Sequence, residues 1–99
     1  KAVKENLDAA RLDASRDVWT TYHDSLSAAR RVDFAEAFVA SAQENFSAIE
    51  AASQTGLSQV AEVAEAAAQL AQARFERADA LADYSTTLAR LALAVGTVR

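Results

Sequence analysis

Apolar residues recur at a regular spacing through the first half of the chain. Between positions 28 and 49 they are separated by alternating steps of four and three residues, the heptad spacing of a coiled-coil helix. The members are Ala28, Val32, Ala35, Val39, Ala42, Phe46 and Ile49. Toward the N-terminus the stripe continues through Ser25, Val18, Ala14, Ala10 and Leu7. This pattern predicts one long helix over about residues 3–53.

A turn is expected at Gly56. The chain has two glycines and no proline, so residues that break helices are scarce. Gly56 can adopt the left-handed conformation that follows many helix ends, and Ser58 can cap the start of a second helix. We therefore expect a tip at 54–58 and a second helix over about 58–95, which Gly96 ends.

The second helix carries an apolar stripe of its own. Its members are Leu57, Val60, Ala64, Ala67, Ala71, Arg74 or Phe75, Ala78, Leu81, Ser85, Leu88, Ala92 and Val95. Folding the chain at Gly56 places the two stripes opposite each other, and near the tip the large Ile49 and Phe46 face small alanines, as close packing requires. The expected pairs are Ile49–Ala64, Phe46–Ala67, Ala42–Ala71, Ala35–Ala78 and Val32–Leu81. The predicted fold class is all-α, a long antiparallel two-helix coiled-coil hairpin.

Further large apolar residues lie outside this seam. The first helix has Leu12, Trp19, Tyr22, Leu26, Phe34 and Phe38, and the second has Val63, Leu70, Tyr84 and Leu91. A lone hairpin would leave these side chains exposed as an association-prone surface. We therefore expect each helix to have neighbours on two sides. Residues 1 to about 14 are expected to have no partner within this chain.

Composition narrows the function classes. The apolar fraction is 52 % but aromatic residues are only 7 %, so alanine dominates, which suits helices that approach closely. A net charge of −4 argues against nucleic-acid binding, for which a basic face is expected. There is no cysteine, and no apolar run approaches the roughly 20 residues of a membrane-spanning helix. The first residues resemble the inside of a helix, so we expect the chain to be a piece of a larger protein.

Residues that could perform chemistry are few. His23 is the one histidine, and no metal-ligand spacing surrounds it, so we interpret it as a packing or surface residue. The arginines at 30, 31, 74 and 77 are expected to pair with neighbouring acids. No serine–histidine–aspartate constellation and no glycine-rich phosphate loop can be assembled. We therefore expect no enzymatic activity, no cofactor and no metal site.

Short motifs follow one another around Gly56. They are VASAQENF (39–46), TGLS (55–58), VAEVAEA (60–66), LAQARFERADALADY (70–84) and LARLALAVGTV (88–98). In this order and spacing they resemble the periplasmic helical hairpin of TolC-type outer-membrane efflux channels. The resemblance covers nearly the whole chain and is tightest over 39–98.

This resemblance implies a place in a larger assembly. The chain would be one hairpin repeat of a periplasmic α-barrel in a homotrimer from a Gram-negative outer membrane, serving efflux or type I secretion. Its partners would be a periplasmic adaptor and an inner-membrane pump. Membrane contact would come only through a β-barrel that lies outside this segment. Which of the family's two hairpin repeats this is stays open.

The resemblance also implies two sets of site residues. Thr55, Gly56, Leu57 and Ser58 match the tip that contacts the adaptor, although valine is usual in the family where Thr55 stands. Glu62 and Glu65 match an acidic ring at the channel entrance, where aspartate is more usual. Each set also has a purely structural interpretation. The tip residues could form a plain turn between helices, and the two glutamates could be acids that stabilise the positive end of a helix.

Three other interpretations remain open from the residues. A periplasmic adaptor also has a long helical hairpin, but no arginine here begins the tip pattern typical of adaptors. Free-standing secreted hairpins of the WXG type place Trp-x-Gly at the turn, whereas Trp19 lies far from Gly56. A plain coiled-coil dimer has no distinguishing motif.

Overall fold

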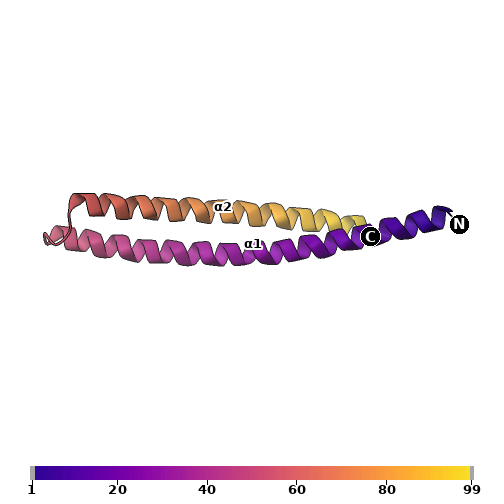
Figure 1. Ribbon diagram of the computed structural model, residues 1–99, viewed down its shortest axis with the longest axis horizontal. Coiled ribbons are helices and arrows are strands. Elements are labelled where there is room, and N and C mark those ends of the chain that lie inside the picture. Colours follow the sequence, from indigo (N-terminus) through magenta and orange to yellow (C-terminus); the bar gives the residue numbers. More distant parts are fainter. Residues whose placement is uncertain (1, 99) are drawn as a thin grey trace. The chain divides into compact units, whose positions relative to one another are not determined.

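The computed structural model describes residues 2–98 and contains two helices (Figure 1). Helix α1 is Ala2–Gln54 and helix α2 is Val60–Val98. The described residues contain no strand, and residues 55–59 connect the helices. The prediction of an all-α helical hairpin is therefore confirmed.

The turn after α1 uses the left-handed conformation expected of Gly56. Its φ is +82°, and its N–H donates to the carbonyl of Ser53 at 3.1 Å. The N–H of Leu57 donates to the carbonyl of Ala52 at 2.7 Å. These two bonds form a Schellman motif, which satisfies carbonyls that the end of a helix would otherwise leave unpaired.

The bounds of α2 differ from the expected ones at both ends. The carbonyl of Gln59 accepts the N–H groups of Glu62 and Val63 at 3.0 and 3.2 Å, so Gln59 occupies the N-cap position and the Ser58 cap was wrong. The expected stop at Gly96 was also wrong, because α2 continues to Val98. A single glycine lowers helix propensity by only about 1 kcal/mol, which does not by itself end a helix.

The chain divides into two compact units. The turn unit is Arg31–Leu81, and the end unit combines Lys1–Arg30 with Ala82–Arg99. Each contains a part of α1 packed against a part of α2. The expectation had been a single hairpin body over 1–99.

In the turn unit, α1 faces α2 with the predicted residues. Val32, Ala35 and Ala42 are buried, and Val39, Phe46 and Ile49 are half-buried. From α2 the facing residues are Val63, Ala66, Leu70, Ala73, Arg77 and Ala80. Leu70, Ala42 and Ala73 form a buried cluster against which Val39 and Phe46 pack. The small residues are the most completely buried, as expected where helix backbones approach closely.

The predicted inner face of α2 was wrong. Ala64, Ala67, Ala71 and Ala78 are exposed, and Leu81 is 42 % exposed. The seam uses the neighbouring line instead, about 100° away around the helix. Because that line contains Val63 and Leu70, it buries more apolar area than a line of alanines. The predicted register along the helix axes was close to the observed one. Ala42 was expected opposite Ala71, and it clusters with Leu70 and Ala73.

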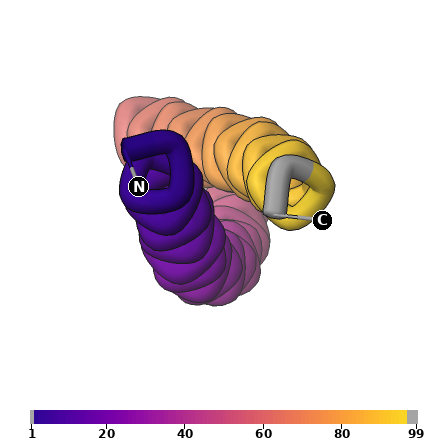
Figure 2. Tube along the Cα trace, turned by 90° about the vertical axis from the view of Figure 1, so that its right-hand side faces the viewer, coloured from indigo at the N-terminus to yellow at the C-terminus, as the bar shows by residue number. Residues whose placement is uncertain are grey.

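The end unit has a more polar seam. Ser25, Ala28 and Thr87 are buried, and the half-buried positions are Ala14, Val18, Thr21, Ala29, Tyr84, Leu91 and Ala94. In Figure 2 the indigo start of α1 and the yellow end of α2 appear as two separate tubes. Residues 2–13 are exposed throughout, including Leu7 and Ala10 of the predicted stripe.

Candidate functional site

The tip residues Thr55–Ser58 form the turn between the helices. The Thr55 hydroxyl donates to the carbonyl of Ala52 at 2.9 Å, which adds to the Schellman bonds. Ser58 is half-buried. Leu57 is 83 % exposed, so this hydrogen-bonded turn presents one large apolar side chain to its surroundings.

Glu62 and Glu65 are both exposed in the first two turns of α2. They line a shallow groove of about 190 Å³ together with Ala66 and Gln69 of α2 and with Asn45 and Ile49 of α1. Sequence reasoning missed Asn45 and Gln69. The signal that could have found them is the correct inner face of α2: once Val63 and Ala66 face α1, the adjoining positions 62, 65 and 69 border the seam.

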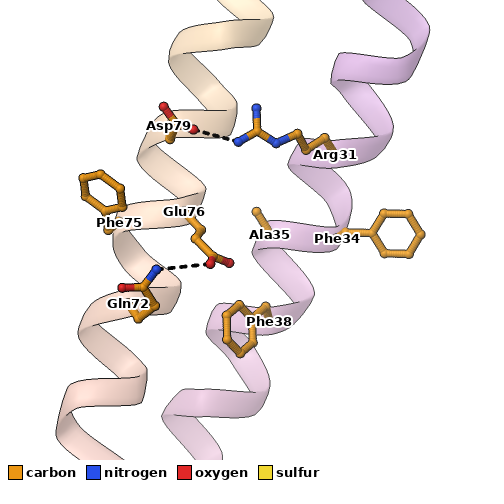
Figure 3. Close-up of a pocket in the computed structure, with 8 residues that line it drawn as sticks. All are labelled: Arg31, Phe34, Ala35, Phe38, Gln72, Phe75, Glu76 and Asp79. Atoms are coloured by element: carbon orange, nitrogen blue, oxygen red, sulfur yellow. Dashed lines mark hydrogen bonds and ion pairs between the residues drawn. The ribbon is translucent and has the colours of Figure 1, made fainter.

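A second, larger groove lies farther from the tip in the same unit. It measures about 530 Å³ and is lined by Arg31, Phe34, Ala35 and Phe38 of α1 and Gln72, Phe75, Glu76 and Asp79 of α2 (Figure 3). The Arg31 guanidinium donates to the Asp79 carboxylate at 2.7 Å, and the Gln72 amide donates to Glu76 at 3.2 Å. Phe34 points away from α2, and Phe75 points away from α1.

Both grooves lie on one side of the hairpin. The polar α2 residues that border them follow each other at steps of three or four, which places them on one helix face. We call this face the acidic flank; its residues are Glu62, Glu65, Gln69, Gln72, Glu76 and Asp79. Ala64, Ala67, Ala71 and Ala78 occupy a different face of α2, here called the alanine flank, and are exposed.

The expected arginine pairs are found in part. Arg31 pairs with Asp79. Arg74 donates to the side-chain oxygen of Gln43 at 3.1 Å, an amide and not an acid. Arg77 is half-buried at a seam position of α2, where a long aliphatic stem can lie against the neighbouring helix.

Two aromatic rings of the end unit, those of Trp19 and Tyr22, lie near His23. The Trp19 and His23 rings lie 4.3 Å apart, edge to face, and Tyr22 lies 6.1 Å from the same imidazole. Trp19, Tyr22 and Leu26 are exposed. Phe34 and Phe38 are exposed as well, but they belong to the other unit and border the acidic flank. The expectation that a lone hairpin leaves this line of α1 exposed is therefore confirmed for all of its members.

Two kinds of feature are absent from the described residues. Over residues 2–98, neither helix has a stretch long and apolar enough to cross a membrane. The same part of the chain contains no group of three or more histidines, cysteines or acids arranged to hold a metal ion.

Residues 1–97 match the family model described as outer membrane efflux protein. No match to a curated protein or to a solved structure was found.

Proposed function

The chain belongs to the outer membrane efflux protein family, and from this premise we propose that it is a periplasmic hairpin of a trimeric channel whose tip docks to an adaptor. The family consists of outer-membrane channels of Gram-negative bacteria, of the TolC type, that transport compounds together with adaptors and pumps. Membership favours a channel component over an adaptor hairpin or a secreted hairpin.

Exposure of Leu57 is the observation that supports docking at the tip. A Schellman motif frequently buries the side chain that follows its glycine against the end of the helix. Here that side chain is 83 % exposed on a turn held by two backbone bonds and a Thr55 side-chain bond. A rigid turn that presents an apolar anchor loses little entropy on binding.

The docking test compares two equally exposed apolar residues. Leu57→Asp in the assembled channel should reduce both co-purification of the adaptor and efflux, because a charge would be buried at the contact. Val3→Asp is the matched control, since Val3 is 81 % exposed and lies in the other unit. Equal loss with both variants, or none with either, would contradict docking through the tip.

The acidic flank supports the second part of the proposal. We infer that Glu62 and Glu65 face the lumen at the periplasmic entrance, where three copies would contribute up to six carboxylates. Like charges gathered in a narrow mouth attract cations and repel anions.

Conductance measurements test this entrance. Glu62→Ala with Glu65→Ala should reduce cation selectivity and weaken block by multivalent cations while the hairpin stays folded. The control, Glu36→Ala with Glu50→Ala, removes the same charge from exposed positions of α1. Unchanged selectivity and block in the first pair would identify these glutamates as ordinary acids at a helix start.

A further inference from the structure

The larger groove combines apolar side chains with excess negative charge. Phe38 contributes a partly exposed aromatic side chain, whereas the rings of Phe34 and Phe75 point away from the opposite helix (Figure 3). The one cation in its lining, Arg31, is paired with Asp79 at 2.7 Å. Glu76 is hydrogen-bonded only to the neutral amide of Gln72 among the bonds drawn in Figure 3. With two carboxylates and one guanidinium, the lining residues carry a net negative charge.

We propose that this groove binds amphiphilic organic cations. Its volume of about 530 Å³ lies within the range of sites that hold small molecules, roughly 300–1,000 Å³. An alkyl or aromatic body would lie against Phe38 and Ala35. An ammonium group would lie near Glu76, where it is also attracted by the face of a neighbouring aromatic ring.

The position of the groove connects this site to export. Glu76 lies on the same helix face as Glu62 and Glu65, separated from them by whole helical turns. If those acids face the lumen, a compound that has passed the entrance meets this groove next. The inference thus rests on the proposed function for its role in transport, while binding to the groove can be measured separately.

A second copy of the chain is the competing occupant. Its alanine flank could cover Phe38, but it would also bury Glu76 and the Arg31–Asp79 pair away from water. Burying carboxylates away from water is costly. Charge therefore favours a small cationic ligand over the alanine flank of another copy, on which Arg74 already donates to Gln43 of its own hairpin.

The first experiment compares two amphiphiles with equal alkyl chains. Decyltrimethylammonium and decyl sulfate, both below their micelle-forming concentrations, are titrated into the 99-residue chain by calorimetry, with circular dichroism to check helicity. We expect saturable binding of the cation and weaker binding of the anion. Equal binding of both, or no saturable binding of the cation, would overturn the proposal.

Variants then locate the binding. Glu76→Gln and Phe38→Ala should each weaken cation binding by about two- to fivefold, the size of an exposed charge pair or cation–π contact. The controls are Glu36→Gln, which removes an exposed acid of α1, and Leu26→Ala, whose side chain is 42 % exposed like that of Phe38. Controls that weaken binding as much as the groove variants would contradict the site.

Sedimentation of the same samples tests whether a second copy of the chain occupies the groove in place of the cation. If the chain associates, cation binding is absent from the associated form, and Phe38→Ala restores monomers, the groove is an interface between copies and the proposal is wrong. If the double variant Glu62→Ala with Glu65→Ala loses channel selectivity but the groove binds no cation, the groove inference is wrong and the proposed entrance stands. Saturable binding with unchanged channel selectivity would instead refute the entrance and leave the groove.

Discussion

The two units hold their helices together with different chemistry. In the turn unit the buried residues are alanines, Val32 and Leu70, and the only charged residue at a seam position is the half-buried Arg77. In the end unit two of the buried residues are Ser25 and Thr87. Their hydroxyls donate to backbone carbonyls of their own helix, at 2.6 Å to Tyr22 and 2.9 Å to Asp83.

A buried polar group can be fully hydrogen-bonded without helping to hold two helices together, and the end unit shows this difference. The hydroxyl bonds remove the cost of burying Ser25 and Thr87, but as bonds within one helix they add no attraction between α1 and α2. Apolar burial, which does add attraction, is concentrated around Leu70. We therefore expect the turn unit to be the more stable of the two, with slower amide hydrogen exchange.

The largest expected effect comes from removing the buried leucine of the turn unit. Leu70→Ala should cost about 2–5 kcal/mol of unfolding free energy, the range for leucine in a packed core. Leu91→Ala, at a half-buried seam position of the end unit, should cost clearly less. Urea denaturation followed by circular dichroism measures both. Equal costs would remove the distinction between the units.

Leu81→Ala sharpens the same test. Leu81 belongs to the stripe that the sequence placed inside the hairpin, but it is 42 % exposed. Its removal should cost under about 1 kcal/mol, as at other surface positions. A larger loss than that of Leu70→Ala would restore the original inner face of α2.

The two glycines form a second contrast between the units. An added Cβ would meet no atom within 4 Å at either position, so only the backbone differs. Gly56→Ala should destabilise by about 1–2 kcal/mol because its φ is +82°, whereas Gly96→Ala in α2 should stabilise by about 0.5–1 kcal/mol. Thermal unfolding of both variants checks the signs, and a neutral Gly56→Ala would rule out a strained turn.

Replacing the buried hydroxyls tests the polar seam directly. Because each bonds only to its own helix, Ser25→Ala and Thr87→Val should change stability by no more than about 1 kcal/mol and can increase it. Hydrogen exchange in the end unit should slow or stay unchanged. A loss above about 2 kcal/mol would mean that the hydroxyls hold the two helices together after all.

The smallest effect is expected from the ion pair of the turn unit. The side chains of Arg31 and Asp79 are 49 % and 59 % exposed, so a double-mutant cycle with Arg31→Gln and Asp79→Asn should give about 0.2–1 kcal/mol. The coupling should fall in high salt, where exposed charges are screened. A coupling that does not change with salt would indicate that the pair is shielded from water.

Helix type, turn position and the inner face of α1 could be predicted because each depends on local pattern. Glycine at 56 predicts the turn, and the four–three spacing from Ala28 to Ile49 predicts which face of α1 packs inward. The inner face of α2 could not be predicted, because α2 has apolar residues at both 63 and 64, and again at 70 and 71. Choosing between such lines requires knowing how much area each buries against α1.

The same ambiguity hid part of the candidate site. Glu62 and Glu65 were found by resemblance, but Asn45 and the groove at Glu76 depend on which face of α2 meets α1. Once Leu70 faces inward, Glu76 borders the seam on the same side as Glu62. The grooves are thus consequences of the helix rotation, which the spacing of residues alone does not determine.

The central functional claim is that the acidic flank faces the lumen of the assembled channel. The 99 residues contain no cysteine. In a channel otherwise free of cysteine, single cysteines are introduced as Glu65→Cys and Glu76→Cys on the acidic flank, and as Ala64→Cys and Ala71→Cys on the alanine flank. A positively charged thiol reagent is then added while current through the channel is recorded in a lipid bilayer. The account predicts that current and cation selectivity fall for the two acidic-flank variants and stay constant for the two alanine-flank variants. The reverse pattern would contradict it.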